Sequence, residues 1–148
     1  MQEATSNAGV VISQQTVADS NAKKAKARKS LAELPVYRSS ANLKYVIVSM
    51  MGRGPRRLAK FFDEMLVTSS EVSKSIGLAD ASRVSDDRVW YINCALTLVY
   101  ELRTDITILQ RLGIIGRDSE NKAKALVRSM IAQLVAWRDY TGSRGVSN

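Results

Sequence analysis

The chain has 148 residues, of which 45% are hydrophobic and 24% charged, with 22 Lys and Arg against 14 Asp and Glu. This much apolar material is enough for a core and the length fits one ordinary domain, which excludes disorder of the whole chain. There is no His, and Cys94 is the single cysteine. This composition excludes Ser–His–Asp and Cys–His nucleophiles, imidazole zinc ligands and an internal disulfide. We therefore expect a non-enzymatic protein with no metal and no other cofactor.

Residues 1–34 are predicted to form a flexible, basic N-terminal tail. The first 19 residues are polar and show no sustained hydrophobic period. Good helix formers without an apolar face follow, and their basic members are Lys23, Lys24, Lys26, Arg28 and Lys29. Two interpretations remain open. The segment contacts nucleic acid and becomes helical on this polyanion, or it is a solvated tail that aids solubility.

Apolar residues then recur with a period of 3.6 in four segments, which predicts four helices. The first helix is expected to begin at Pro35 and to be ended by Gly52 and Gly54, and the second to begin at Pro55 and end near Ala79. The third helix is expected to be capped by Ser85 or Asp86 and to end with Gly113 as its C′ residue. The fourth is expected to be capped by Asp118 or Ser119 and to stop before Gly142. Residues 142–148 are expected to form a flexible C-terminus.

The connections between these segments are only a few residues long, and short links make neighbouring helices antiparallel. We therefore predict an all-α protein in which residues 35–141 form an antiparallel up-down-up-down four-helix bundle. No run approaches the roughly 18 apolar residues of a membrane span, and the first residues do not resemble a secretory signal. The expected location is the cytoplasm of a prokaryote, with the protein encoded by the cell or by a phage.

Positive charge is concentrated near the start of the predicted bundle. Between Lys23 and Lys60 there are eleven basic residues and one acidic residue, so the remainder of the chain is slightly acidic. Four of these cations surround the first predicted corner: Arg53, Arg56, Arg57 and Lys60. Cations near a helix N-terminus are unfavourable by a few tenths of a kcal/mol each, whereas phosphates bind well there and arginine donates to them in bidentate fashion. The pattern favours contact with a nucleic-acid backbone, and an acidic patch of a partner or plain solvation remains the alternative.

The acidic residues are scattered, apart from Glu101 and Asp105, which are spaced to lie on one side of the third helix. Two carboxylates in this arrangement could bind one metal ion. The sequence has no second pair that would complete a two-metal site in a bundle. We interpret these residues as a polar seam that pairs with Arg88 or Arg128 on neighbouring helices.

Three segments carry a resemblance to a known family through their apolar positions and through the pair Pro55 and Arg56. They are Leu43 to Leu66, Arg88 to Ile115 and Ala125 to Trp137, within about 100 residues. The chain resembles the small four-helix-bundle family of the accessory variability proteins of diversity-generating retroelements and the proteins encoded in intervening sequences of ribosomal RNA genes.

The resemblance implies a non-enzymatic homopentamer with a basic surface, which binds a reverse transcriptase together with RNA or DNA during mutagenic cDNA synthesis. It carries the nucleic-acid-binding role over to Arg53, Arg56, Arg57 and Lys60, and gives no role to the N-terminal extension. The alternative function is a structural or regulatory helical-bundle interaction protein with no nucleic-acid role.

Overall fold

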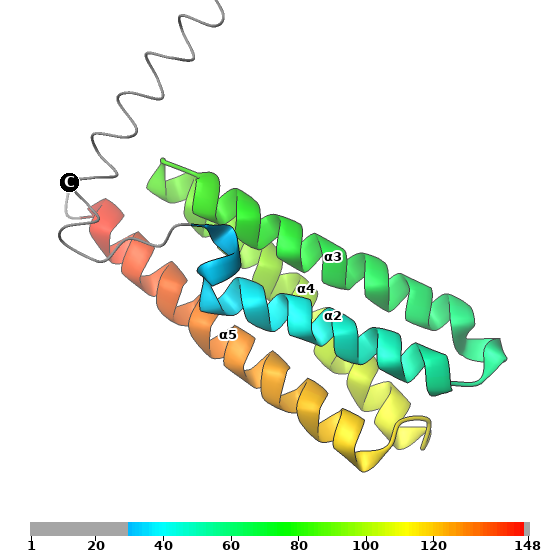
Figure 1. The fold of residues 1–148 in the computed structure, drawn as a ribbon. Helices are drawn as coiled ribbons and strands as arrows, with labels where there is room; N and C mark the ends of the chain where they lie inside the picture. The colour runs from blue at the N-terminus through cyan, green and yellow to red at the C-terminus, as the bar shows by residue number, and fades with distance from the viewer. Residues whose placement is uncertain (1–29, 147–148) are drawn as a thin grey trace, which may run out of the picture. The chain divides into compact units, whose positions relative to one another are not determined.

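The computed structural model describes residues 30–146, and the side chains within them as far as Arg144. This part of the chain contains four α-helices and no strand, which confirms the predicted all-α bundle (Figure 1). The elements in chain order are η1 (Leu31–Glu33), α2 (Pro35–Arg53), η2 (Arg56–Leu58), α3 (Ala59–Ala81), α4 (Ser85–Arg111) and α5 (Arg117–Val146). Most of the predicted tail, including Lys23, Lys24, Lys26, Arg28 and Lys29, lies outside the described residues.

Successive helices run in opposite directions and are joined by short connections (Figure 1). α2 packs against α3 and α5, and α4 packs against the same two helices. The connections α2–α3 and α4–α5 therefore lie at one end of the bundle, and the α3–α4 connection lies at the other. This up-down-up-down order decides which charged side chains share an end.

The core forms where the apolar stripes of the four helices meet. Ile47 on α2, Ile76 on α3, Ile106 on α4 and Leu134 on α5 are fully buried. Each of these residues has other buried residues three or four positions away on its own helix, because that spacing returns side chains to the same side of a helix. Burying one such side chain contributes about 1.5–3 kcal/mol, so the shared core holds the helix ends in place.

Three predicted helix starts are wrong. The second helix does not begin at Pro55, because this residue is extended and precedes the short turn η2. α4 begins at Ser85 after Val84, which forms no side-chain cap, so neither Ser85 nor Asp86 is the cap. In α5 the carbonyl of Gly116 accepts the first bond, from Glu120 N–H, so neither Asp118 nor Ser119 is the cap residue.

The predicted ends of α4 and α5 differ in outcome. Gly113 has a φ of +67° and follows α4 as predicted. Its N–H donates to Gln110 O and Ile114 N–H donates to Leu109 O, which is the Schellman arrangement. The predicted stop before Gly142 is wrong, because α5 continues to Val146. Gly142 thus lies inside the helix, where a glycine costs about 1 kcal/mol relative to alanine.

Arg88 closes the α3–α4 connection. Its Nε donates to Ala79 O at 3.0 Å and its Nη2 donates to Ser82 O, so the guanidinium satisfies two carbonyls at the end of α3. A cation there also interacts favourably with the negative end of the helix dipole. Across residues 30–146, none of the helices has both the length and the apolar character needed to cross a membrane.

Candidate nucleic-acid interface

The corner between α2 and α3 displays the four cations that the sequence singled out. Arg53 is the last residue of α2, Arg56 and Arg57 lie in η2, and Lys60 lies in the first turn of α3. Leu58 is partly buried against the core, which anchors η2 from inside. All four cations are exposed. The short turn thus places its apolar residue inward and its arginines in solvent.

A close contact between Gly54 and Phe62 sets the path of this corner. Phe62 is 1% exposed, and a Cβ added at Gly54 would lie 2.7 Å from Phe62 Cε2. Only glycine allows the backbone to pass this close to the buried ring. Pro55 then extends the chain, and Leu58 N–H donates to Pro55 O at 3.0 Å to begin the turn. The two arginines therefore stand on a backbone that packing holds in place.

In the part of the chain that the structure describes, Arg53, Arg56, Arg57 and Lys60 form no ion pair. Asp63 lies near Lys60 in sequence and is itself exposed. The four cations therefore remain hydrated, and their N–H groups remain available to donate hydrogen bonds to a ligand. An exposed guanidinium of this kind binds a phosphate oxygen without first breaking an internal salt bridge.

The structure brings further cations to the same end, which the sequence reasoning missed. Figure 1 shows the α4–α5 connection beside the α2–α3 corner. Around it lie Arg111 at the end of α4, and Arg117 and Lys122 at the start of α5, all exposed. We call these three together with the four corner residues the basic end. The predicted topology could have revealed these three cations, because an up-down-up-down bundle places its first and third connections at the same end.

A hollow of about 330 Å³ joins the two halves of the basic end. It lies between α2 and α5, and among its lining residues are Tyr45, Arg53, Asp118 and Lys122. Tyr45 is 74% exposed, so its ring is accessible beside the two cations. Asp118 is the acidic member and lowers the local charge. An aromatic ring next to exposed cations can stack on an unpaired base while the cations contact the backbone.

The polar seam predicted at Glu101 and Asp105 is not formed with the expected partners. Arg88 binds the carbonyls at the end of α3, and Arg128 lies with Arg103 in a hollow between α4 and α5. Asp105 instead approaches two carboxylates. Burial raises the pKa of Asp105, and the negative charges of Glu101 and of Glu64 on α3 raise it further. The sequence failed here because it does not show which side of α4 meets which neighbour.

Within residues 30–146, no three carboxylate or thiol side chains come together in an arrangement that could hold a metal ion. No protein-family model matches this chain, and no curated protein matches its sequence.

Proposed function

We propose that the chain is a non-enzymatic accessory protein that binds nucleic acid through its basic end and works with a reverse transcriptase, as in a diversity-generating retroelement. One observation carries the proposal: two connections far apart in sequence place seven exposed cations at one end of the bundle. The retroelement and the homopentamer enter through the family resemblance of the three segments.

Contacts of this kind are made to phosphates, so binding should depend strongly on salt and weakly on sequence. The arginines donate to phosphate oxygens, and Tyr45 offers one ring for a base. Because stacking needs an unpaired base, a single strand uses both contacts and a duplex uses only the first. We expect single-stranded RNA to bind more tightly than duplex DNA of equal length.

The test is fluorescence anisotropy with labelled single-stranded RNA and duplex DNA at about 50 and 200 mM salt. The Arg56→Ala/Arg57→Ala chain should bind at least tenfold more weakly than the wild type. The matched control is Arg38→Ala, which removes an exposed cation of α2 close to its other end. Equal affinity of all three chains, or no binding at the lower salt, contradicts the proposal.

Exposed apolar side chains favour a second candidate function, a structural or regulatory interaction protein without nucleic acid. Val48 on α2 and Val67 on α3 are 49% and 59% exposed. A hollow of about 320 Å³ next to Val67 is lined by that residue, Leu66, Ser70, Glu71 and Lys74. In this case Val48→Ser/Val67→Ser abolishes capture of a partner protein, whereas the Arg56→Ala/Arg57→Ala change has no effect.

A further inference from the structure

Two hollows share Arg103 and form one groove on the face of α4 and α5. The first, of about 310 Å³, lies between the two helices and is lined by Arg103, Thr107, Lys124, Val127, Arg128 and Ile131. The second, of about 320 Å³, continues along α4 from Arg103 to Arg111. Because Arg111 belongs to the basic end, the groove leads away from that end along the side of the bundle. We call the two hollows together the lateral groove.

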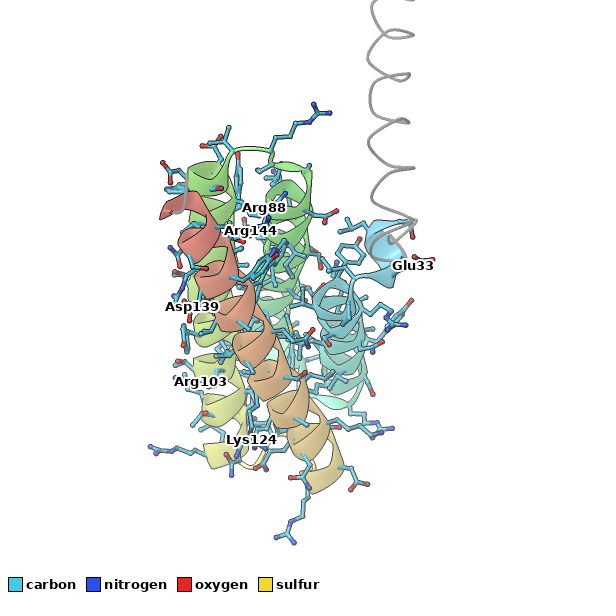
Figure 2. The ribbon with its side chains drawn as sticks, turned by 90° about the vertical axis from the view of Figure 1, so that its left-hand side faces the viewer. Glu33, Arg88, Arg103, Lys124, Asp139 and Arg144 are labelled. Atoms are coloured by element: carbon cyan, nitrogen blue, oxygen red, sulfur yellow. The ribbon has the colours of Figure 1, made fainter. Side chains whose placement is uncertain are left out.

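The lateral groove gathers cations that the fold does not neutralise. Arg103 and Arg128 line it from neighbouring helices, both are exposed, and neither forms an ion pair within the described residues. Figure 2 shows Arg103 and Lys124 on the face turned to the viewer; Lys124 Nζ lies 2.8 Å from Glu120 Oε1 and is already paired. No carboxylate lines either hollow. Two guanidiniums that line one hollow without a carboxylate repel each other, and a bound anion removes this repulsion.

The ring of Tyr100 adds an aromatic surface beside the groove. Tyr100 is 40% exposed, and the Arg103 guanidinium lies 4.8 Å from the centre of its ring. This contact orients the guanidinium without neutralising its charge. Aromatic rings and guanidinium planes both stack on unpaired bases. The α4 side of the groove therefore offers a positive charge and a stacking surface together.

The apolar part of the groove is too small to hold an amphipathic helix of a partner protein. Val127 is 2% exposed and Ile131 is only partly exposed, so Ile108 is the one exposed apolar side chain among the lining residues. An amphipathic helix binds by burying several apolar side chains in a hydrophobic groove. A single nucleic-acid strand instead needs cations along its path and flat surfaces for its bases. The lateral groove therefore favours a strand over an acidic protein segment.

The lateral groove and the hollow beside Tyr45 lie on opposite sides of α5. Lys122 lines the hollow between α2 and α5, whereas Lys124 lines the groove between α4 and α5. A step of two residues turns a side chain by about 200° around a helix, which places these two lysines on opposite sides of α5. Arg111 and Arg117 flank the connection that joins α4 to α5. A strand that crosses this connection therefore meets cations before, at and after the crossing.

We propose that a single strand of RNA binds across the basic end and continues along the lateral groove, where Arg103 and Arg128 extend the site onto the side of the bundle. This inference rests on the proposed function and adds a second part to its site. The phosphates contact the guanidiniums, and bases stack on Tyr45 on one side of α5 and beside Tyr100 on the other. Duplex DNA is too stiff to turn over the connection within one bundle. Short strands therefore use the basic end alone, and longer strands use both parts.

The first test measures the affinity of the full chain for labelled oligouridylates by fluorescence anisotropy. Lengths of about 4, 8 and 16 nucleotides cover the site sizes of single-strand binding modules. The affinity of the wild type should rise with length, because a longer strand reaches the lateral groove as well. The Arg103→Ala/Arg128→Ala chain should bind the shortest strand as the wild type does, and the longest about tenfold more weakly.

The salt dependence of binding counts the phosphate contacts that the groove variant loses. With the longest strand, the slope of log Kd against log salt should fall by about 1.4 in the Arg103→Ala/Arg128→Ala chain, which is about 0.7 for each of two phosphates. With the shortest strand the slope should equal that of the wild type. The matched control is Arg38→Ala/Arg83→Ala, which removes two exposed cations near the other end of the bundle. This control loses the same net charge and should bind both strands like the wild type.

Two results overturn the extended site while the proposed function stands. In the first, the groove variant binds every length like the wild type although Arg56→Ala/Arg57→Ala loses affinity, which leaves the groove to an acidic protein segment. In the second, the control weakens binding as much as the groove variant, so net charge alone explains the loss. A wild-type affinity of Arg56→Ala/Arg57→Ala, combined with a weakened groove variant, instead rejects the proposed corner site. A wild type that binds no strand rejects both.

Discussion

Arg53 and Lys122 line one hollow although they belong to α2 and α5, the first and last helices of the bundle. Neither residue is in the sequence neighbourhood of the other. The antiparallel order of the helices brings them together, and this order follows from short connections between four amphipathic segments. The basic end is thus a product of topology as well as of local sequence.

Gly54→Ala should destabilise the fold by about 1–3 kcal/mol, because the new Cβ meets the buried ring of Phe62 at 2.7 Å and the core has to shift. Gly52→Ala is the matched control. Its Cβ would meet nothing within 4 Å, and the change lies inside α2, so it should stabilise by about 0.5–1 kcal/mol. Urea unfolding of both variants measures the two effects. Equal effects would show that the corner is not held by this contact.

Arg88→Ala should lower the free energy of unfolding by about 1–3 kcal/mol, since two partly buried carbonyls lose a charged donor. Arg83→Ala removes an exposed cation from the same connection and should leave stability within about 0.5 kcal/mol of the wild type. Denaturant unfolding under one set of conditions compares the two. A neutral Arg88→Ala change would mean that water replaces the guanidinium without loss.

Asp105→Asn should raise stability at neutral pH. The pKa of Asp105 is raised above its ordinary value of 3.8 in the folded chain, so the folded state binds this proton more tightly than the unfolded state. Stability contributed by the group is therefore lost as the pH rises through the folded pKa, and it is retained below the unfolded pKa. The asparagine variant escapes this loss.

The measurement is urea unfolding across a pH series at low protein concentration, where association does not contribute. The gain of Asp105→Asn over the wild type should shrink toward acid pH. Asp63→Asn, a change at an exposed carboxyl, is the control. A gain that is constant with pH would assign the effect to packing rather than to ionisation.

The apolar pattern predicted that four helices form, because helix formation in this chain depends on burying apolar side chains. Each of the four helices buries several side chains along its apolar stripe, as α2 does with Leu43 and Ile47. No single substitution therefore removes the hydrophobic period that predicts a helix. Helix ends depend on one or two hydrogen bonds each. Ser85 and Asp118 are good capping residues in isolation, yet both lie within the helix, because the preceding backbone already supplies the first carbonyl.

The charged surfaces were only half predicted. Arg56 and Arg57 were found because they cluster in sequence, whereas Arg117 and Lys122 belong to the same end only because α5 begins there. The side of α4 on which Glu101 lies was also missed. It depends on the rotation of α4 against α3, which the packing of the whole core sets rather than any local pattern.

The slope of log Kd against log salt concentration tests the central claim most directly, because it counts the phosphates that the protein neutralises. For single-stranded RNA the slope should fall by about 0.7 for each phosphate contact removed. The account predicts a reduced slope both for Arg56→Ala/Arg57→Ala and for Arg117→Ala/Lys122→Ala, since both pairs belong to one basic end. Slopes identical to that of the wild type in both variants would contradict it.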